Sequence, residues 1–255
     1  MNSGRAAQDA NVIVINGLAK KFDDITAVKD LNLEIHKGEM FGFLGPNGAG
    51  KTTTISMLSG LLKPTSGSAQ IAGIDVGNEP RKAKELLGVC PQEAAVFKFL
   101  TGMENLTLFG NLHGMDKQVL KKRAADLVNQ ADFSDAAKRR TKGYSGGMMR
   151  QLNLMIALIS DPEIVFLDEP TVGMDARARR RTWEYIGSLK DQGKTVILTT
   201  HYIEEAEALS DRVGIIDYGE LIALGTPAEL MAEHEVKDLE SVFLNITGRR
   251  IAEGS

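Results

Sequence analysis

The fold of this chain is decided by the stretch Gly45-Pro46-Asn47-Gly48-Ala49-Gly50-Lys51-Thr52-Thr53. It contains glycine, four further residues, glycine, lysine and then threonine, which is the spacing of a phosphate-binding loop. A strand-sized apolar segment, Met40 to Leu44, precedes it, and a helical pattern over Lys51 to Leu58 follows it. A turn between a buried strand and a helix presents backbone N–H groups to an anion. The sequence therefore predicts an α/β fold that binds a nucleotide at this turn.

Each residue type in this loop has a chemical use. The three glycines let backbone N–H groups converge on phosphate oxygens without a Cβ in the way. Lys51 would bring a positive charge to the β- and γ-phosphates of ATP, and the Thr52 hydroxyl would be a ligand of Mg²⁺. The alternative is a merely tight strand-to-helix turn. We expect nucleotide contacts from the whole loop: Gly45, Pro46, Asn47, Gly48, Ala49, Gly50, Lys51, Thr52 and Thr53.

Composition places the chain among ordinary globular proteins. Its 255 residues fit one large domain or a core domain with a smaller lobe, and 43% are hydrophobic. The longest apolar runs are strand-sized, far below the ~20 residues that cross a bilayer. A net charge of -4 argues against a dedicated nucleic-acid binder. The single cysteine, Cys90, excludes an intramolecular disulfide and is expected to be buried, so we predict a cytosolic protein.

Apolar segments and helical patterns alternate along most of the sequence, which is typical of a parallel sheet. An antiparallel edge sheet is expected from Val12 to Ile15, Leu31 to Ile35 and Ser66 to Val76. Between Thr101 and Leu158 the strand signal disappears, so a helical lobe is expected there, with one apolar face made by Leu152, Met155, Ile156 and Ile159. The expected core strands are Met40 to Leu44, Leu87 to Cys90, Ile164 to Asp168, Thr195 to Thr200 and Val213 to Asp217.

Two adjacent carboxylates, Asp168 and Glu169, end an apolar run, and Pro170 stops the strand after them. In an open parallel sheet, ligands bind beyond the carboxyl ends of the strands. Because side chains alternate along a strand, the two carboxylates should point in different directions. We therefore assign Asp168 to Mg²⁺ and Glu169 to accept a proton from the attacking water. A solvated Asp-Glu pair at a strand end is the alternative.

His201 follows the strand Thr195 to Thr200, which has the same orientation. A neutral imidazole there would donate to the γ-phosphate or orient the attacking water. The alternatives are a helix-capping histidine and a metal pair with Glu204 or Glu205. No cysteine or second histidine lies near, and Glu204, Glu205 and Glu207 have the pattern of the solvent-exposed face of a surface helix.

Two further residues gain meaning only from their context. Gln92 follows the strand Leu87 to Cys90 and would reach the metal or its water, and the Phe22 ring would stack on a base or lie in the core. The basic clusters at 121–123, 138–140 and 177–181 have acidic residues among them and no interleaved aromatic residues. They therefore indicate solvated helix faces rather than a base-stacking surface.

With these residues in order, the chain resembles the ATP-binding subunits of ABC transporters from about Val12 to Gly248. The resemblance rests on the phosphate loop, Gln92, the Tyr144-Ser145-Gly146-Gly147-Met148 signature, the Asp168-Glu169 pair and His201. It implies a D-loop at Gly173-Met174-Asp175, and nucleotide contacts from Phe22, which takes the place of the adenine-stacking aromatic, and from Val28. It also implies that the signature residues Ser145, Gly146, Gly147 and Met148 close over the γ-phosphate held by a second ATPase subunit, another copy or a paralogue.

The resemblance implies a P-loop NTPase (RecA-like) α/β fold: a parallel-sheet core with an antiparallel β edge sheet and an inserted α-helical lobe. Residues 12–248 would be the ATPase domain, with 12–100 and 160–225 as the catalytic core and 101–159 as the helical lobe. Residues 226–255 would be a C-terminal helical extension and tail, and residues 1–11 a flexible tail. ATP and Mg²⁺ would be the ligands, and a polytopic permease would hold the protein at the cytoplasmic face of the cell membrane.

Departures from the family pattern indicate a branch. Tyr144 and Met148 flank Ser-Gly-Gly where leucine and glutamine are commonest. These residues, with 200–207 and 239–244, look like the drug-, lipid- and polysaccharide-exporting ABC-2 group, so we favour export over import. The alternative is a soluble ABC ATPase acting on DNA or ribosomes. Such DNA proteins insert a long coiled coil between Gln92 and Ser145, where only a compact lobe fits, and such translation factors usually carry two cassettes. A P-loop kinase or small GTPase leaves the signature and His201 unexplained.

Overall fold

Six strands form the central sheet of the protein, which we describe from a computed structural model for residues 11–93, 95–249 and 251. Their order is β10-β9-β3-β8-β7-β6; β10 pairs antiparallel with β9, and the other pairs are parallel. The bounds are β3 Met40–Leu44, β6 Leu87–Cys90, β7 Ile164–Asp168, β8 Thr195–Thr200, β9 Arg212–Asp217 and β10 Glu220–Gly225. The five predicted core strands are present, with Arg212 added to the last, so the predicted parallel-sheet core is confirmed.

A second, antiparallel sheet has the order β2-β1-β4-β5. Its strands are β1 Asn11–Phe22, β2 Ile25–His36, β4 Ser66–Ile71 and β5 Ile74–Asp75. β1 and β2 are much longer than predicted, because register shifts after Ile15 and Leu18 interrupt the alternation that marks a strand. Asn11, expected in the flexible tail, is instead the first residue of β1 and pairs with His36. The rest of the expected tail, residues 1–10, lies outside the described residues.

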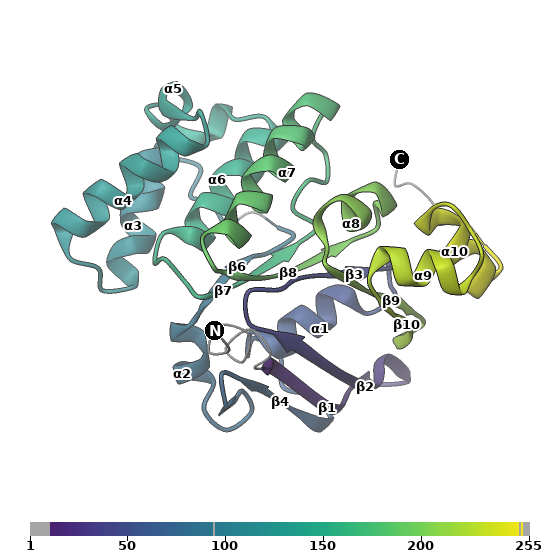
Figure 1. The fold of residues 1–255 in the computed structure, drawn as a ribbon. Helices are drawn as coiled ribbons and strands as arrows, with labels where there is room; N and C mark the ends of the chain where they lie inside the picture. The colour runs from purple at the N-terminus through teal and green to yellow at the C-terminus, as the bar shows by residue number, and fades with distance from the viewer. Residues whose placement is uncertain (1–10, 94, 250, 252–255) are drawn as a thin grey trace, which may run out of the picture.

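Helices cover both faces of the central sheet (Figure 1). α1 lies between it and the antiparallel sheet, α6, α7 and α8 lie across the other face, and α3 to α5 form a lobe at one end. The bounds are α1 Lys51–Leu58, α2 Pro80–Glu85, α3 Gly102–Leu112, α4 Lys117–Gln130, α5 Ser134–Ala137, α6 Gly146–Leu158, α7 Ala176–Asp191, α8 Ile203–Leu209, α9 Pro227–Glu233 and α10 Leu239–Thr247, with a 3-10 turn at Thr141–Gly143. None of the helices in the described part of the chain is long and apolar enough to span a membrane.

The burial of the central sheet on both faces explains why its strands are continuous apolar segments in the sequence. Phe41 and Phe43 on β3 pack toward α1 and the antiparallel sheet, and Met40 packs toward the opposite cluster that contains α6. A sheet buried on both faces needs apolar residues at every position rather than alternation. The predicted apolar face of α6 is buried, as is Cys90. Because β3, β6, β7 and β8 run parallel to one another, their carboxyl ends lie at one edge of the sheet.

A third apolar cluster holds the C-terminal helices against this core. Phe243 and Val242 of α10 and Leu230 of α9 pack with Leu44, the last residue of β3, and with Val213 and Ile215 of β9. β10, which joins this region, was not predicted, because four of its six residues are half-buried and it lacks a continuous apolar run.

Candidate active site

The phosphate-binding loop connects β3 to α1. Gly50 caps α1 with a φ of 107°, and a Cβ on it would lie 2.4 Å from the backbone oxygen of Ala27, so only glycine fits. No side chain caps α1, and no acidic residue occupies its first turn. The positive end of the helix therefore faces a pocket of about 200 Å³ lined by Ala27, Asn47, Gly48, Gly50, Lys51, Thr52, Thr53, Gln92 and Glu169.

Lys51 lies in this pocket with its ammonium group almost fully buried. Its Nζ donates to the backbone oxygens of Gly45 at 2.7 Å and Pro46 at 3.1 Å, and it lies 3.5 Å from Glu169 Oε1. Burial lowers the pKa of Lys51, and the neighbouring carboxylates of Glu169 and Asp168 offset part of that effect. An ammonium held by carbonyl oxygens and one carboxylate is placed to exchange these partners for phosphate oxygens.

Asp168, the last residue of β7, is turned toward the start of α1. Its Oδ1 accepts hydrogen bonds from the Thr52 hydroxyl at 3.1 Å and from the Thr199 hydroxyl of β8. A carboxylate and a hydroxyl side by side are the hard oxygen donors that suit Mg²⁺. No cluster of three or more histidine, cysteine or acidic side chains suited to a metal occurs within residues 11–93, 95–249 and 251. The donor set thus fits an ion held partly by a nucleotide and water.

Glu169 lies at the centre of the site, just beyond the end of β7. Its φ is 49°, and its backbone N–H donates to the backbone and side-chain oxygens of Thr199, both at 3.1 Å. This left-handed turn, rather than strand alternation alone, separates its carboxylate from that of Asp168. Glu169 Oε1 lies 3.1 Å from His201 Nδ1, and Oε2 accepts from Gln92 Nε2 at 3.3 Å.

Glu169 is 4% exposed. Burial raises its pKa, but the hydrogen bond with His201 and the charge of Lys51 outweigh burial and hold the pKa below its usual range. Glu169 is therefore ionised at neutral pH and able to accept a proton. Gln92, predicted near the metal, points its amide group at this carboxylate.

His201 follows β8 and is 5% exposed. It does not cap a helix, because the residue at the N-cap of α8 is Tyr202, whose ring packs 4.3 Å from the imidazole. The prediction that the glutamates after His201 form an exposed helix face is wrong at one position. Glu204 and Glu207 are exposed, whereas Glu205 is fully buried and bonded to Thr171 and Trp183. Partners from distant segments bury this carboxyl group, and local sequence carries no sign of them.

The signature residues lie apart from this pocket. Ser145 caps α6, and its hydroxyl accepts from the Met148 backbone N–H at 3.3 Å. A second pocket, of about 390 Å³, is lined by residues 145–148 together with Gly173, Met174 and Asp175. Asp175 caps α7 and accepts from the Ala178 N–H. The residues that line the two pockets do not overlap, so the signature and the phosphate loop of one subunit form separate pockets.

Five predicted nucleotide contacts are not among the residues that line the pocket of about 200 Å³: Gly45, Pro46 and Ala49 of the loop, and Phe22 and Val28 outside it. Phe22, at the end of β1, is 43% exposed. The Lys20 Nζ atom lies over its ring, 4.9 Å from the ring centre. Val28 is buried in the core beside Gly50. Sequence reasoning missed Ala27, whose backbone shapes the pocket, and Thr199, which bonds both Asp168 and Glu169. Two consecutive threonines at the end of an apolar strand were the available signal for Thr199.

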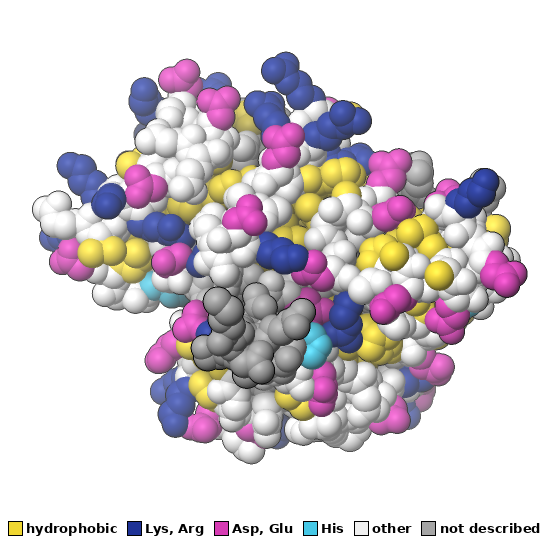
Figure 2. All heavy atoms as spheres, viewed as in Figure 1, with side chains coloured by type: hydrophobic (Ala, Val, Ile, Leu, Met, Phe, Trp, Pro, Cys, Tyr) yellow, Lys and Arg dark blue, Asp and Glu magenta, His cyan; other side chains and the backbone are white. Residues whose placement is uncertain are grey.

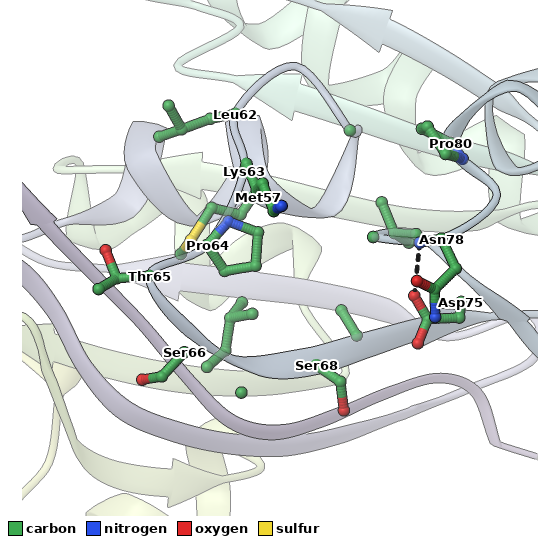
Figure 3. A pocket seen from close by; sticks show the side chains of 16 residues that line it. Met57, Leu62, Lys63, Pro64, Thr65, Ser66, Ser68, Asp75, Asn78 and Pro80 are labelled. Atoms are coloured by element: carbon green, nitrogen blue, oxygen red, sulfur yellow. Dashed lines mark hydrogen bonds between the residues drawn. The ribbon is translucent and has the colours of Figure 1, made fainter.

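A further pocket, of about 490 Å³, opens beside β4 and the loop after α1 (Figure 3). Met57, Leu62 and Pro64 form its apolar side, and Ser66, Ser68 and Asp75 line its polar side. Asp75 Oδ1 accepts from the Asn78 backbone N–H at 2.9 Å, the bond drawn in Figure 3. Lys51, Glu169 and His201 are not among the residues that line this pocket, and we assign no ligand to it.

The fold and the site define a P-loop nucleoside triphosphatase. The sequence profile of the ABC transporter family matches residues 28–172. The chain is 43% identical over 246 residues to the doxorubicin resistance ATP-binding protein DrrA of Mycobacterium tuberculosis, covering 92% of this chain and 74% of that protein. It is 45% identical over 213 residues to the linearmycin resistance ATP-binding protein LnrL of Bacillus subtilis, covering 84% and 68%.

Among solved structures, a dimeric bacterial ABC transporter cassette superposes with a TM-score of 0.78 at 27% identity, covering 84% of this chain and 98% of that one. The chain belongs to the ATP-binding subunits of ABC transporters. It is an ATPase whose ATP hydrolysis is coupled to transport. Its relatives include the Nod factor export ATP-binding protein I of Ralstonia nicotianae, to which it is 40% identical over 225 residues, covering 88% of this chain and 70% of that protein.

Proposed function

We propose that this subunit hydrolyses ATP at sites shared between two ATPase subunits and thereby powers export through a separate transmembrane permease. In each site, one subunit contributes Lys51, Glu169 and His201, and the other contributes Ser145, Gly146, Gly147 and Met148. The permease would hold the pair at the cytoplasmic face of the membrane.

The proposed roles follow from the contacts at the edge of the sheet. The loop N–H groups and Lys51 bind the phosphates, and Lys51 exchanges its contact with Glu169 for the γ-phosphate. Glu169 accepts a proton from the attacking water, and His201 holds the Glu169 carboxylate through its Oε1 atom. Thr52 and Asp168 would hold Mg²⁺, and Gln92, just beyond β6, would hold the neighbouring Glu169 carboxylate through Oε2. When bound, the ion would neutralise charge on the phosphates.

The glycines of the signature carry the proposal of a shared site. Glycine weakens a helix by about 1 kcal/mol relative to alanine, so two in the first turn of α6 need a reason. Neither has a left-handed φ. A Cβ on Gly146 would meet nothing within 4 Å, and one on Gly147 would meet only Met174 Cγ, at 3.7 Å. Nothing within the described chain requires glycine there, which supports close approach by a group from outside the subunit.

Export is supported by the relatives and by the surface. Relatives more than 40% identical are named for resistance to doxorubicin, linearmycin and daunorubicin. On the face shown in Figure 2, lysine and arginine side chains are interspersed with acidic ones over the helical lobe. That mixture supports a protein partner rather than the alternative of a nucleic-acid or ribosome-bound ATPase.

The shared site is tested by Gly147→Asp. An aspartate fits this subunit sterically but places a negative charge where the γ-phosphate of the partner site would lie. We expect the variant to bind ATP with wild-type affinity, through its intact phosphate loop, and to lose ATP-dependent dimerisation in sedimentation velocity.

Gly143→Asp is the matched control, because Gly143 is exposed, lies just outside the signature and also has open space at its Cβ position. It should dimerise like wild type. Loss of ATP binding in Gly147→Asp, or wild-type dimerisation, would refute the shared site. Export is tested separately, because an exporter subunit should co-purify from membranes with a polytopic partner, whereas a nucleic-acid factor should co-purify with DNA or ribosomes.

A further inference from the structure

Glu205 is a fully buried carboxyl group that the proposed chemistry does not use. It lies in α8 with 0% of its surface exposed. Its Oε1 accepts two hydrogen bonds, from the Thr171 hydroxyl at 2.7 Å and from the Trp183 indole N–H at 2.8 Å. Its Oε2 makes no hydrogen bond of good geometry within residues 11–93, 95–249 and 251, although the nearby Thr200 side chain also acts to lower the pKa of this carboxyl group. Burying a carboxyl group is costly, and an apolar side chain would fill the same space at lower cost.

The hydrogen-bond donors to Glu205 come from two segments next to the site, the turn after Glu169 and the helix α7. Thr171 is two residues beyond Glu169, in the turn that joins β7 to α7. Trp183 lies in α7, the helix that Asp175 caps. Glu205 itself is one helical turn beyond His201. One oxygen atom therefore joins the Glu169 turn, the helix after the D-loop and the His201 segment.

A second contact joins α7 to the same segment. The Arg179 guanidinium lies 4.5 Å above the ring of Tyr202, and that ring packs against the His201 imidazole. Arg179 is also the charged group that acts on Glu205. α7 thus holds the His201 segment at Tyr202 and at Glu205, on either side of the start of α8.

We propose that Glu205 is a positioning residue for ATP hydrolysis. By tying the Thr171 turn and α7 to α8, it fixes the 3.1 Å contact between Glu169 and His201, which come from neighbouring strands. Two neutral donors meet on one oxygen, so an apolar replacement leaves both buried and unpaired. Asparagine is too short to reach them, whereas glutamine keeps an acceptor at the same place.

Trp183 is the single tryptophan of the chain, so its fluorescence reports directly on this cluster. We expect Glu205→Ala to change the Trp183 emission and to lower kcat ~100-fold, because small displacements of catalytic groups have effects of that size. Its affinity for ATP should stay within about twofold of wild type, since the phosphate loop is untouched. Glu205→Gln should keep the emission and most of kcat.

Thr171→Val removes one donor without changing the size of the side chain, and it guards against misfolding of the alanine variant. It should lower kcat less than Glu205→Ala does, and combining the two should cost no more than Glu205→Ala alone. Glu204→Ala and Glu207→Ala are matched controls on the exposed face of the same helix. Both should leave emission and kcat unchanged.

The proposal is overturned if Thr171→Val leaves kcat at wild-type values while Glu205→Ala loses kcat, ATP binding and folded protein together. It is also overturned if Glu205→Ala turns over like Glu204→Ala. Because the proposal rests on the roles given to Glu169 and His201, Glu169→Gln is measured beside it. Normal hydrolysis by Glu169→Gln refutes those roles, whereas an inactive Glu169→Gln with a fully active Glu205→Ala refutes only the positioning role.

Discussion

Replacing Glu169 with glutamine separates proton acceptance from nucleotide binding. Glutamine keeps the size of the side chain and an oxygen to hydrogen-bond the attacking water, but it does not take a proton from it at neutral pH. Removing a positioned general base typically costs a factor of ~10² to 10⁴ in rate. We therefore expect turnover to fall by that factor.

The effect on ATP binding has the opposite direction. In the structure the Glu169 carboxylate lies 3.5 Å from Lys51 Nζ, and both side chains are buried. With an effective dielectric constant of ~20, their attraction amounts to about 5 kcal/mol before solvation is counted. Glu169→Gln removes the carboxylate that competes with phosphate oxygens for Lys51, and with it one negative charge facing the γ-phosphate. ATP affinity should therefore hold or increase, and the ATP-bound dimer should accumulate.

The assay combines phosphate release, ATP affinity and sedimentation with and without ATP-Mg²⁺. Glu163→Gln is the control, because it removes an exposed carboxylate just before the other end of β7. It should behave like wild type. A near wild-type rate in Glu169→Gln, or a loss of ATP binding as complete as in Lys51→Ala, would show that Glu169 is not the base.

Three other substitutions test the rest of the site and its surroundings. Lys51→Ala should lose ATP binding and hydrolysis together, because it removes the only side-chain cation of the phosphate loop; wild-type turnover would contradict the nucleotide site. Asp168→Asn should weaken both nucleotide binding and the dependence of the rate on Mg²⁺, and an unchanged Mg²⁺ titration would exclude it as a ligand. Burial raises the pKa of Glu205, and its hydrogen bonds and Arg179 only partly offset this. The folded state therefore binds a proton more tightly than the unfolded state, and the contribution of Glu205 to stability is lost as pH rises through the folded pKa. Urea unfolding should show Glu205→Gln gaining stability relative to wild type as the pH rises above the ordinary pKa of a glutamate carboxyl group, and a constant difference would contradict this.

Much of the fold was predictable because its signals are local. The core strands are short apolar runs, and the loop before Lys51 needs glycine for reasons that hold in any chain. β10 and the full lengths of β1 and β2 were missed because half-buried or bulged strands lose the periodicity that identifies them. Strand pairing, rather than residue pattern, defines those elements.

The site was predictable as a set of residues but not as a set of contacts. The motifs identified Lys51, Glu169 and His201, yet the sequence does not indicate that Lys51 and His201 meet on the same Glu169 oxygen. The burial of Glu205 was predicted wrongly, because its partners are 34 and 22 residues away in sequence. Tertiary contacts of this kind override the helical pattern of exposed charges.

The order of strands has a consequence for synthesis of the chain. β3, which carries the phosphate loop, pairs only with β8 and β9 in its sheet, and β8 begins at Thr195. A growing chain that has completed the loop therefore lacks a partner for β3 until about 150 further residues are made, which takes on the order of 10 s at typical rates of translation. During that interval β3 has two unpaired edges and an apolar surface. Nascent chains stalled before β8 should bind chaperones rather than ATP.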